Sequence, residues 1–439
     1  MKLQFGIITF ILSIASLASA QQVATPTFDP DGGTSVFHVK TDGSDQNDGL
    51  TWDTAKQTIQ AAVSLANSGD EVWVAKGTYS GPVYLSDGVE LYGGFAGGES
   101  TLEQRDLKAN KTILDAGQGY GIKAMTGYST AVVDGFTILT GYGGTGVWCD
   151  EASATVRNNV ISQADGPTGG MGIRLGYSVN PYPYVVANNL IVGKSWGIWF
   201  SRGHAGLIAN NTIVGSSVMA IRLERTKVTL VNNIIAFNAR GVGQGYRAEV
   251  TMDHNCVFGN ILYDYVGEFP HPTDINVDPL FAESSYRLRF DSPCIDAGTN
   301  EGAPPTDIEG SIRPMDGNHD GLAVADIGAY ESPMPVQVDV LHDTVRLQPN
   351  KLVQVAILSD PVFNALRVDP ATVFFGSGNA QEIHGKGHPE DVNGDGLTDL
   401  LFHFSCAESG IVPGYQTVFL QGKLKTGEDF IGWDNVTAR

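Results

Sequence analysis

TVRNNVI at residues 155–161 returns as VVANNLI at 185–191, as LIANNTI at 207–213 and as VTLVNNII at 228–235. The asparagine pairs in these four segments are 30, 22 and 22 residues apart. Asp134-Gly135 and His254-Asn255 continue the series at its two ends, at steps of 24 and 22 residues. A fixed period of this length predicts a solenoid in which each repeat is one supersecondary unit.

A second marker, Gly or Ala followed by Ile or Val, recurs out of phase with the asparagines. It occurs in GIKAM (121–125), GVWCD (146–150), GIRLG (172–176), GIWFS (197–201), AIRLE (220–224) and GVGQG (241–245). Between the markers, short runs of Val, Ile and Leu alternate with small or polar residues, which is typical of β-strands. We therefore predict an all-β fold, a right-handed parallel β-helix with three short strands per coil.

Asparagine suits the same turn of every coil for two reasons. Its amide can bond its own backbone and the asparagine one rung away, and it tolerates left-handed backbone geometry. Leucine-rich repeats have a similar period, but Leu is too scarce between residues 121 and 258 to support that alternative.

The N-terminal sequence predicts export. MKLQFGIITFILSIASLASA (1–20) has one Lys, an apolar run and a small-residue cleavage site, as a secretory signal peptide does. We expect a protein that is extracellular or periplasmic, with attachment to the cell surface left open, and no transmembrane segment. Residues 21–35 are expected to be a linker.

A short helix is expected to cover the first coil. Thr54 and Gln57 have capping-box spacing, and an apolar face follows at Ile59, Ala62, Val63 and Ala66. Terminal caps of this kind protect the open end of a solenoid core.

Two further stretches carry a resemblance. VKTDGSDQNDGLTWDTAKQTIQAA (39–62) with GDEVWVAKGTY (69–79) is similar to the N-terminal part of secreted bacterial pectate-lyase-like right-handed β-helix proteins. DPLF (278–281), YRL (286–288), SPCIDAGTN (292–300), RPMDG (313–317) and DIGAYE (326–331) resemble the closing segment of the same group. The resemblance implies a β-helix domain over 36–331, closed by residues 278–331, and an exported protein. Members of the group include lyases, hydrolases, epimerases and proteins of no assigned activity.

The C-terminal part has a different pattern. SPMPVQ (332–337) is expected to be a linker, and the alternating segments of 338–439 predict a β-sandwich module. The four cysteines Cys149, Cys256, Cys294 and Cys406 allow three pairings, although Cys149 falls on an inward strand position and is expected to be a buried thiol.

The third residue of each Gly-Ile or Gly-Val segment is predicted to point outward, because the apolar second residue points inward. This column contains Lys123, Trp148, Arg174, Trp199, Arg222 and Gly243. At roughly 4.8 Å per rung its five charged or aromatic members span about 19 Å. The alternative is that cations and indoles stack on one another for stability alone.

Charge indicates an acidic polymer as the partner. The chain has a formal charge of −21, which argues against nucleic acid, yet residues 121–258 hold ten Lys and Arg against seven Asp and Glu. Aromatic faces stack on sugar rings and Arg pairs with carboxylate or sulfate. We expect an acidic polysaccharide to be bound by a monomer, through Trp148, Trp199, Asp150, Arg202 and Glu224.

The expected reaction is β-elimination of a uronate, which needs a neutralising cation, a base and an acid. The candidate catalytic residues are Lys123, Arg174, Arg222, Tyr177 and His204. Two alternatives stay open: a non-catalytic surface or adhesion protein that binds carbohydrate, and a glycoside hydrolase, for which the paired-Asp pattern is missing.

Two acidic loops predict Ca²⁺ sites, because side chains at alternate loop positions converge on one point. The first contains Asp316, Asn318, Asp320 and Asp326, and the second Asp391, Asn393, Asp395 and Asp399. The second resembles the loop of dockerin-like and EF-hand-like segments, although Phe402 stands where the last acid would be. His384, His388 and His403 are expected to be loop or strand residues rather than a metal site.

Overall fold

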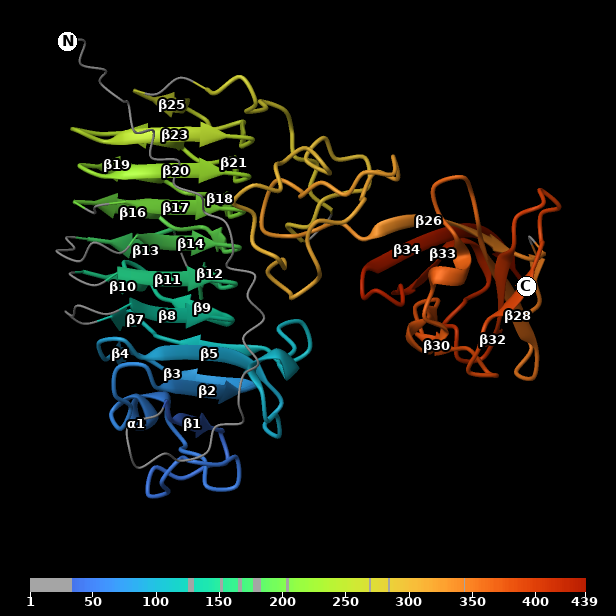
Figure 1. Cartoon of the computed structure of the whole chain (residues 1–439), viewed down its shortest axis with the longest axis horizontal. Helices are drawn as coiled ribbons and strands as arrows, with labels where there is room; N and C mark the ends of the chain where they lie inside the picture. The colour runs from blue at the N-terminus through green and yellow to red at the C-terminus, as the bar shows by residue number, and fades with distance from the viewer. Residues whose placement is uncertain are drawn as a thin grey trace, which may run out of the picture.

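The computed structural model describes residues 34–124, 130–150, 153–164, 168–176, 183–202, 205–267, 270–282, 285–342 and 344–439. The expected signal peptide and most of the expected linker that follows it lie outside these ranges. The described part is almost entirely β, with a solenoid of stacked coils and a separate C-terminal domain (Figure 1). No described helix is long and apolar enough to cross a membrane.

Three parallel sheets form the walls of the solenoid, and each coil after β1 contributes one strand to each sheet. The first sheet contains β1 (Val36–Val39), β2 (Glu71–Ala75), β5 (Glu90–Phe95), β8 (Thr130–Asp134), β11 (Ser153–Arg157), β14 (Tyr184–Ala187), β17 (Gly206–Ala209), β20 (Lys227–Val231) and β23 (Glu249–Asp253). The second contains β4 (Val83–Leu85), β7 (Tyr120–Ala124), β10 (Thr145–Cys149), β13 (Met171–Leu175), β16 (Trp196–Ser201), β19 (Met219–Glu224), β22 (Arg240–Gln244) and β25 (Tyr263–Val266). The third contains β3 (Gly77–Ser80), β6 (Thr112–Asp115), β9 (Phe136–Thr140), β12 (Val160–Gln163), β15 (Leu190–Val192), β18 (Thr212–Val214), β21 (Ile234–Ala236) and β24 (Cys256–Phe258). The predicted parallel β-helix is confirmed.

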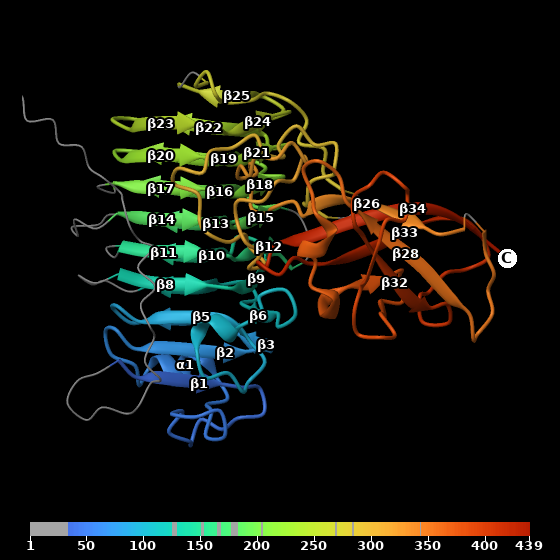
Figure 2. The same cartoon turned by 45° about the vertical axis from the view of Figure 1, so that its right-hand side comes forward.

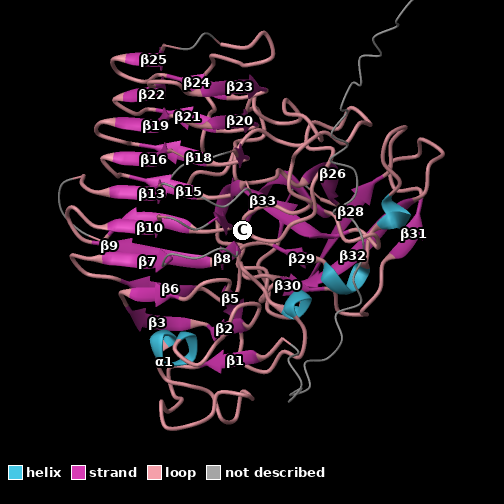
Figure 3. Cartoon of the chain, turned by 60° about the vertical axis from the view of Figure 1, so that its left-hand side comes forward, coloured by secondary structure: helices cyan, strands magenta, loops and turns pink. Residues whose placement is uncertain are grey.

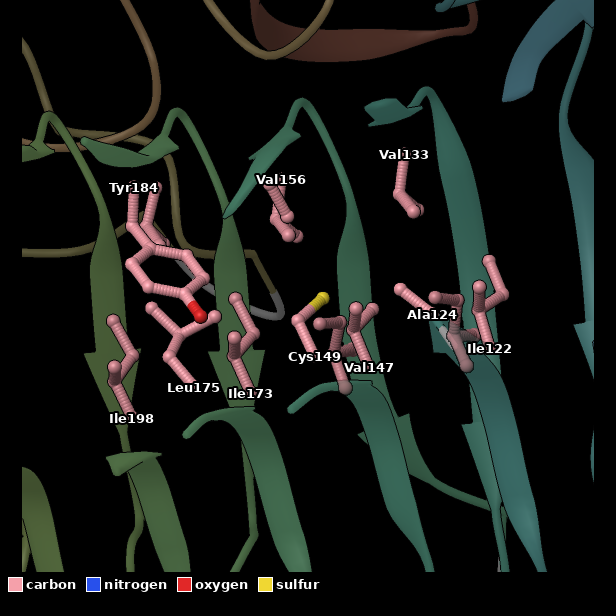
Figure 4. Close-up of a cluster of buried hydrophobic side chains, with 14 of the residues drawn as sticks. Ile122, Ala124, Val133, Val147, Cys149, Val156, Ile173, Leu175, Tyr184 and Ile198 are labelled. Carbon is pink, nitrogen blue, oxygen red and sulfur yellow. The ribbon is translucent and has the colours of Figure 1, made fainter. Parts of the chain in front are cut away.

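The repeated Gly-Ile marker is explained by packing inside the stack. Its apolar residues Ile122, Val147, Ile173 and Ile198 follow one another along the core and are fully buried (Figure 4). A Cβ on the preceding glycines Gly121, Gly146, Gly172 and Gly197 would lie 2.4–2.6 Å from the side chain of an Ile in the third sheet. The glycine therefore lets two sheets approach closely at each corner.

The two asparagines of each pair have different roles. The first takes the left-handed backbone conformation, with φ of 57°, 53°, 51° and 55° at Asn158, Asn188, Asn210 and Asn232. The second forms a buried ladder in which the side-chain oxygen of each accepts from the backbone N–H and the amide of the asparagine one rung earlier. This ladder runs through Asn159, Asn189, Asn211, Asn233 and Asn255 at 2.9–3.1 Å. Asp274 ends it by accepting from Asn255.

The predicted alignment of Asp134-Gly135 with the asparagine pairs is wrong by one residue. Asp134 pairs in register with Arg157, so Gly135, with a φ of 86°, takes the left-handed position. Asp134 is instead a fully buried carboxylate bound by Arg105 and Arg157, each at 2.7 Å. Arginine neighbours, rather than turn chemistry, explain an acid at this place.

The capping helix is shorter than expected. Helix α1 spans only Ile59–Val63, and its N-cap is Thr58, whose side chain accepts from the N–H of Ala61. The predicted capping box at Thr54 and Gln57 is therefore wrong, because Asp45 binds the N–H groups of Gln57 and Thr58. The apolar face itself is buried at the end of the stack, where α1 lies beside β1, as predicted (Figure 3). A 3₁₀ turn, η1 (Leu102–Gln104), follows β5.

The closing segment lies beside the solenoid rather than over its end (Figure 1). Its backbone is bonded by the first asparagines of successive rungs: Asn188 donates to Thr306 O, Asn210 to Asp326 O and Asn232 to Thr299 O. Buried Arg313 donates to Glu331 at 2.6 Å and to Asn188 at 2.7 Å. The expectation that residues 278–331 close the end of the stack is wrong, because the asparagine turns provide a lateral row of polar partners for this segment.

The C-terminal domain is one mixed sheet that curls around its own core (Figure 2). Its elements are β26 (Met334–Val340), β27 (Thr344–Val345), β28 (Leu352–Leu358), η2 (Ala365–Arg367), η3 (Pro370–Thr372), β29 (Phe374–Phe375), β30 (Ala380–Gln381), β31 (His388–Glu390), β32 (Asp399–Ser405), β33 (Gly414–Lys423) and β34 (Asp429–Ala438). The segment 332–337 is not a simple linker, since β26 begins at Met334 and pairs with β34 and β28. His319 Nε2, in the closing segment, contacts Asp360 Oδ2 at 2.7 Å and ties the domain to the solenoid side.

Candidate functional site on the second solenoid sheet

The register of the second sheet stacks the predicted outward residues in one column. Trp148 pairs with Lys123 on one side and with Arg174 on the other, Trp199 pairs with Arg174 and Arg222, and Gly243 follows. Tyr84 precedes Lys123 in the same column. Sequence reasoning missed Tyr84 because 39 residues separate it from Lys123, against 21–26 between later members.

The indoles are less exposed than expected. Trp148 and Trp199 are both half-buried. The Lys123 ammonium lies 4.5 Å from the Trp148 ring and the Arg174 guanidinium 4.4 Å from the same ring. Trp199 packs against Trp196 with ring centroids 5.1 Å apart. The expectation that Trp148 offers an open face for sugar stacking is therefore wrong, because cations already occupy that ring.

Carboxylates hold both arginines of the column. Arg222 donates from Nε and Nη2 to Glu224 Oε1 at 2.9 and 2.7 Å. Arg174 lies 3.7 Å from Asp150 Oδ2. Asp150 and Glu224 thus orient the guanidinium groups, and they offset part of the positive charge that the sequence analysis assigned to the column.

A second row of arginines lies at the turn that leads from the second sheet to the first. Arg202, Arg225 and Arg247 all have left-handed backbones, with φ of 58°, 50° and 54°. The N–H of Arg202 bonds Glu224 O and that of Arg225 bonds Tyr246 O, so each arginine lies one rung from the next. All three are exposed. We call this row the arginine ridge.

The arginine ridge is not neutralised by acids within the described ranges. None of its guanidinium groups has a carboxylate within 4.0 Å there, in contrast to Arg174 and Arg222. Tyr246 packs between Arg225 and Arg247, at 5.3 and 4.9 Å from their guanidinium carbons. A non-glycine residue in this conformation costs about 1–2 kcal/mol, and neighbouring cations repel by roughly 0.9 kcal/mol at the rung spacing in water. Such costs point to a function for the ridge.

Sequence reasoning placed Arg202 at the site but missed Arg247 and Tyr246. The signal was present, since SRG, ERT and GYR recur at 22–23-residue steps, but it was masked by an extra residue in β22's turn. Tyr177 and His204, two of the candidate catalytic residues, lie outside the described residues, as does Glu151 beside Asp150.

The two predicted calcium loops have different geometries. In the second, Asp391, Asn393 and Asp395 are exposed and accept backbone N–H groups of their own loop, whereas Asp399 is fully buried. The Asp399 carboxylate accepts from Ser359 N and Val392 N at 2.8 and 2.9 Å.

In the first loop, Asp316 and Asn318 both accept from the N–H of Asp320. Asp326 instead is buried and accepts from Asp296 N and Ser332 N, and burial together with Glu331 raises its pKa. In both loops the last acid of the predicted set thus accepts from two backbone N–H groups, of which at least one lies outside the loop.

The cysteines do not form disulfides. All four are described and buried as free thiols, and burial raises the pKa of Cys149 to about 12. Cys149 points into the core as predicted (Figure 4).

Comparison with known proteins gives one family and one solved structure. The model of a family described as "Protein of unknown function (DUF1565)" matches residues 41–264. The crystal structure of pectate lyase Pel9A matches with a TM-score of 0.32 and 14% sequence identity, over 69% of this chain and 97% of that chain. No curated protein matches the chain.

Proposed function

The chain belongs to the DUF1565 family, and since that family is described by its unknown function, we propose from the residues themselves that this protein binds an acidic polysaccharide along its second solenoid sheet. The proposal is carried by the arginine ridge, in which three exposed cations follow one another at the rung spacing. An anionic polymer laid along the solenoid axis would meet a cation at each rung. Carboxylate or sulfate groups would pair with the guanidinium fork.

The column beside the ridge supports binding through cations rather than through stacking. Lys123 and Arg174 cover the two sides of Trp148, and Glu224 fixes Arg222. Held cations lose little side-chain entropy when an anion arrives, which favours affinity. From Tyr84 to Arg222 the column spans five rung steps, about 24 Å.

β-Elimination is the second candidate function, and the acids near the cations favour it: Asp150 and Glu224 are titratable groups within reach of Arg174 and Arg222. The distance between the candidate base and the candidate neutralising cation argues against elimination. The base and the neutralising cation must reach the same uronate. Lys123, a candidate base, and Arg174, a candidate neutralising cation, lie two rungs apart, roughly 10 Å, with the Trp148 indole between them. We therefore place binding first.

Export and calcium stay predictions. Residues 1–20 lie outside the described part, and N-terminal sequencing of the mature protein would show whether they are removed. Thermal unfolding at increasing Ca²⁺ concentration tests the loops at 316–326 and 391–399, and binding should raise the unfolding midpoint.

Affinity chromatography and calorimetry on polygalacturonate, alginate and a sulfated dextran, with neutral dextran for comparison, test the proposal. Arg225→Asn and Arg247→Asn remove charge but keep a residue that tolerates the left-handed turn, as Asn232 does. Each should weaken binding by about 0.2–1 kcal/mol, and added salt should weaken it further. Lys227→Gln is the control, because Lys227 is an exposed cation on the first sheet.

Retention that is equal on neutral and sulfated dextran would refute acidic-polymer binding. Retention on the acidic polymers that neither Arg225→Asn nor Arg247→Asn weakens would refute the role assigned to the arginine ridge. Ultraviolet absorbance of unsaturated products, measured on the same polymers, tests elimination separately. Product formation that is lost in Arg222→Ala would move the assignment from binding to cleavage.

A further inference from the structure

The edges of the C-terminal sheet meet at a seam beside β32. Glu382 follows β30 and forms an antiparallel bridge with Phe404, while β31 pairs with the first half of the same edge of β32. The curl of the sheet thus brings together four residues that are distant from the solenoid site. They are Glu382, His384, His388 and His403.

One ligand atom from each of these four residues lies within 4.8 Å of the others. His384 Nδ1 is 3.0 Å from Glu382 Oε1 and 3.2 Å from His388 Nε2. His403 Nδ1 is 3.9 Å from the same Glu382 oxygen. Ligands held about 2.0–2.1 Å from a tetrahedral zinc ion are roughly 3.3 Å apart, so these separations are close to those of a zinc site.

The three imidazole rings are arranged around a common centre. Their centroids are 5.1, 5.2 and 5.2 Å apart, and each pair of rings is close to perpendicular, at 89°, 74° and 86°. The rings are thus T-shaped to one another, and one nitrogen atom of each lies within 4.8 Å of the others. Hydrogen bonds alone account for the cluster poorly, because Nδ1 of His403 is buried and has no hydrogen-bond partner among the described residues.

Gln354 supports the other side of His403. The Gln354 amide lies 3.1 Å from His403 Nε2, across the paired strands β28 and β32. The amide oxygen and nitrogen exchange places by a 180° flip, so Gln354 can accept the Nε2 proton. That tautomer leaves the Nδ1 lone pair free and directed at the cluster, which is how metal-binding histidines are commonly held.

We propose that Glu382, His384, His388 and His403 bind one divalent transition-metal ion of the zinc class. Imidazole nitrogen suits zinc, copper and nickel, whereas calcium prefers oxygen ligands, so this site differs in chemistry from the predicted calcium loops. Four protein ligands close a tetrahedral shell, which is the arrangement of structural sites. The ion would link the turn after β30 with strands β31 and β32, and would thereby stabilise the contact between the two edges of the sheet.

Metal analysis and calorimetry on untagged full-length protein test this site, with ZnCl₂ as the probe. We expect one zinc per chain, and a thermal unfolding midpoint that rises with zinc and falls with a chelator. His384→Ala and His388→Ala should each abolish stoichiometric binding, and Gln354→Leu should weaken it about tenfold. His384 is on an exposed turn, so its loss should leave the fold intact, which circular dichroism would check.

His271→Ala is the matched control, because that histidine is in the solenoid and its side chain is 48% exposed, against 43% for His384. The control should retain one zinc per chain, and excess Ca²⁺ should leave zinc binding unchanged. Absence of zinc binding by the folded wild-type chain, or full binding by both histidine variants, would overturn the proposal.

Discussion

Lys194 is a buried ammonium group whose removal should stabilise the protein in a pH-dependent way. It follows β15 at the corner between the third and second sheets, and its side chain is fully buried. Its Nζ donates to Thr140 Oγ1 at 2.5 Å. No carboxylate of the described residues lies within ion-pairing distance. Burial lowers the pKa of Lys194 from 10.5 to about 8.

The magnitude follows from linkage. A difference of about 2.5 pKa units between the unfolded and folded chain corresponds to up to about 3 kcal/mol at 1.36 kcal/mol per unit. Below pH 8 the lysine is charged in both states and the full penalty is present. Between pH 8 and 10.5 the unfolded chain binds more protons, so the free energy of unfolding of the wild type rises with pH. Above pH 10.5 the penalty vanishes.

Lys194→Met should therefore be more stable than wild type by about 2–3 kcal/mol at pH 7, and this advantage should shrink between pH 8 and 10.5. Urea unfolding at pH 7 and pH 10, followed by tryptophan fluorescence, measures the two differences. Comparing the two pH values cancels the gain from the apolar side chain, which does not depend on pH. Lys227→Met, at an exposed position, should show no such dependence. An advantage of equal size at both pH values would refute the reasoning.

Two further predictions concern the polar interior. Asn211→Ala should lower the free energy of unfolding by about 2–4 kcal/mol, because it leaves buried donors and acceptors of two rungs without hydrogen-bond partners. Asn435→Ala, at the surface, should have little effect and is the control. Chemical denaturation of the two variants measures the difference. Arg313→Ala should cost about 3–5 kcal/mol by leaving Glu331 buried and unpaired, and should expose residues 278–331 to protease. Arg289→Ala removes only an exposed ion pair and is its control, and equal proteolysis of both variants would contradict the docking role assigned to Arg313.

The solenoid was predictable from the sequence because equivalent positions of successive coils carry the same residue types. Asn159, Asn189 and Asn211 occupy one ladder position, and the apolar residues of the Gly-Ile segments share one inward column. Such positions give the strand register without tertiary information. The misalignment at Asp134 arose at the end of the ladder, where Phe136 takes the place of an asparagine and only its backbone N–H bonds Asn159.

Contacts that join distant segments were not predictable. Nothing local to Arg313 shows that it reaches Asn188, 125 residues away, and so the lateral path of the closing segment was missed. The histidine cluster depends in the same way on the curl that brings Glu382 to β32. Stacking of cations on Trp148 was one of two alternatives that the sequence allowed. Only the packing of Lys123 and Arg174 shows that the indole ring is covered rather than open to a ligand.

The asparagine ladder has a consequence for how such a chain can change length. One coil is longer than its neighbours, since its ladder step covers 30 residues against 22 in the next three, yet the ladder bonds across it are of ordinary length, at 3.1 Å. Its additional residues fall in the connections on either side of β13, at 164–170 and 176–183. Because the strands on both sides of a connection return to the same fixed bonds, the stack tolerates additional residues between them without a change in the rung spacing that sets the spacing of the arginine ridge.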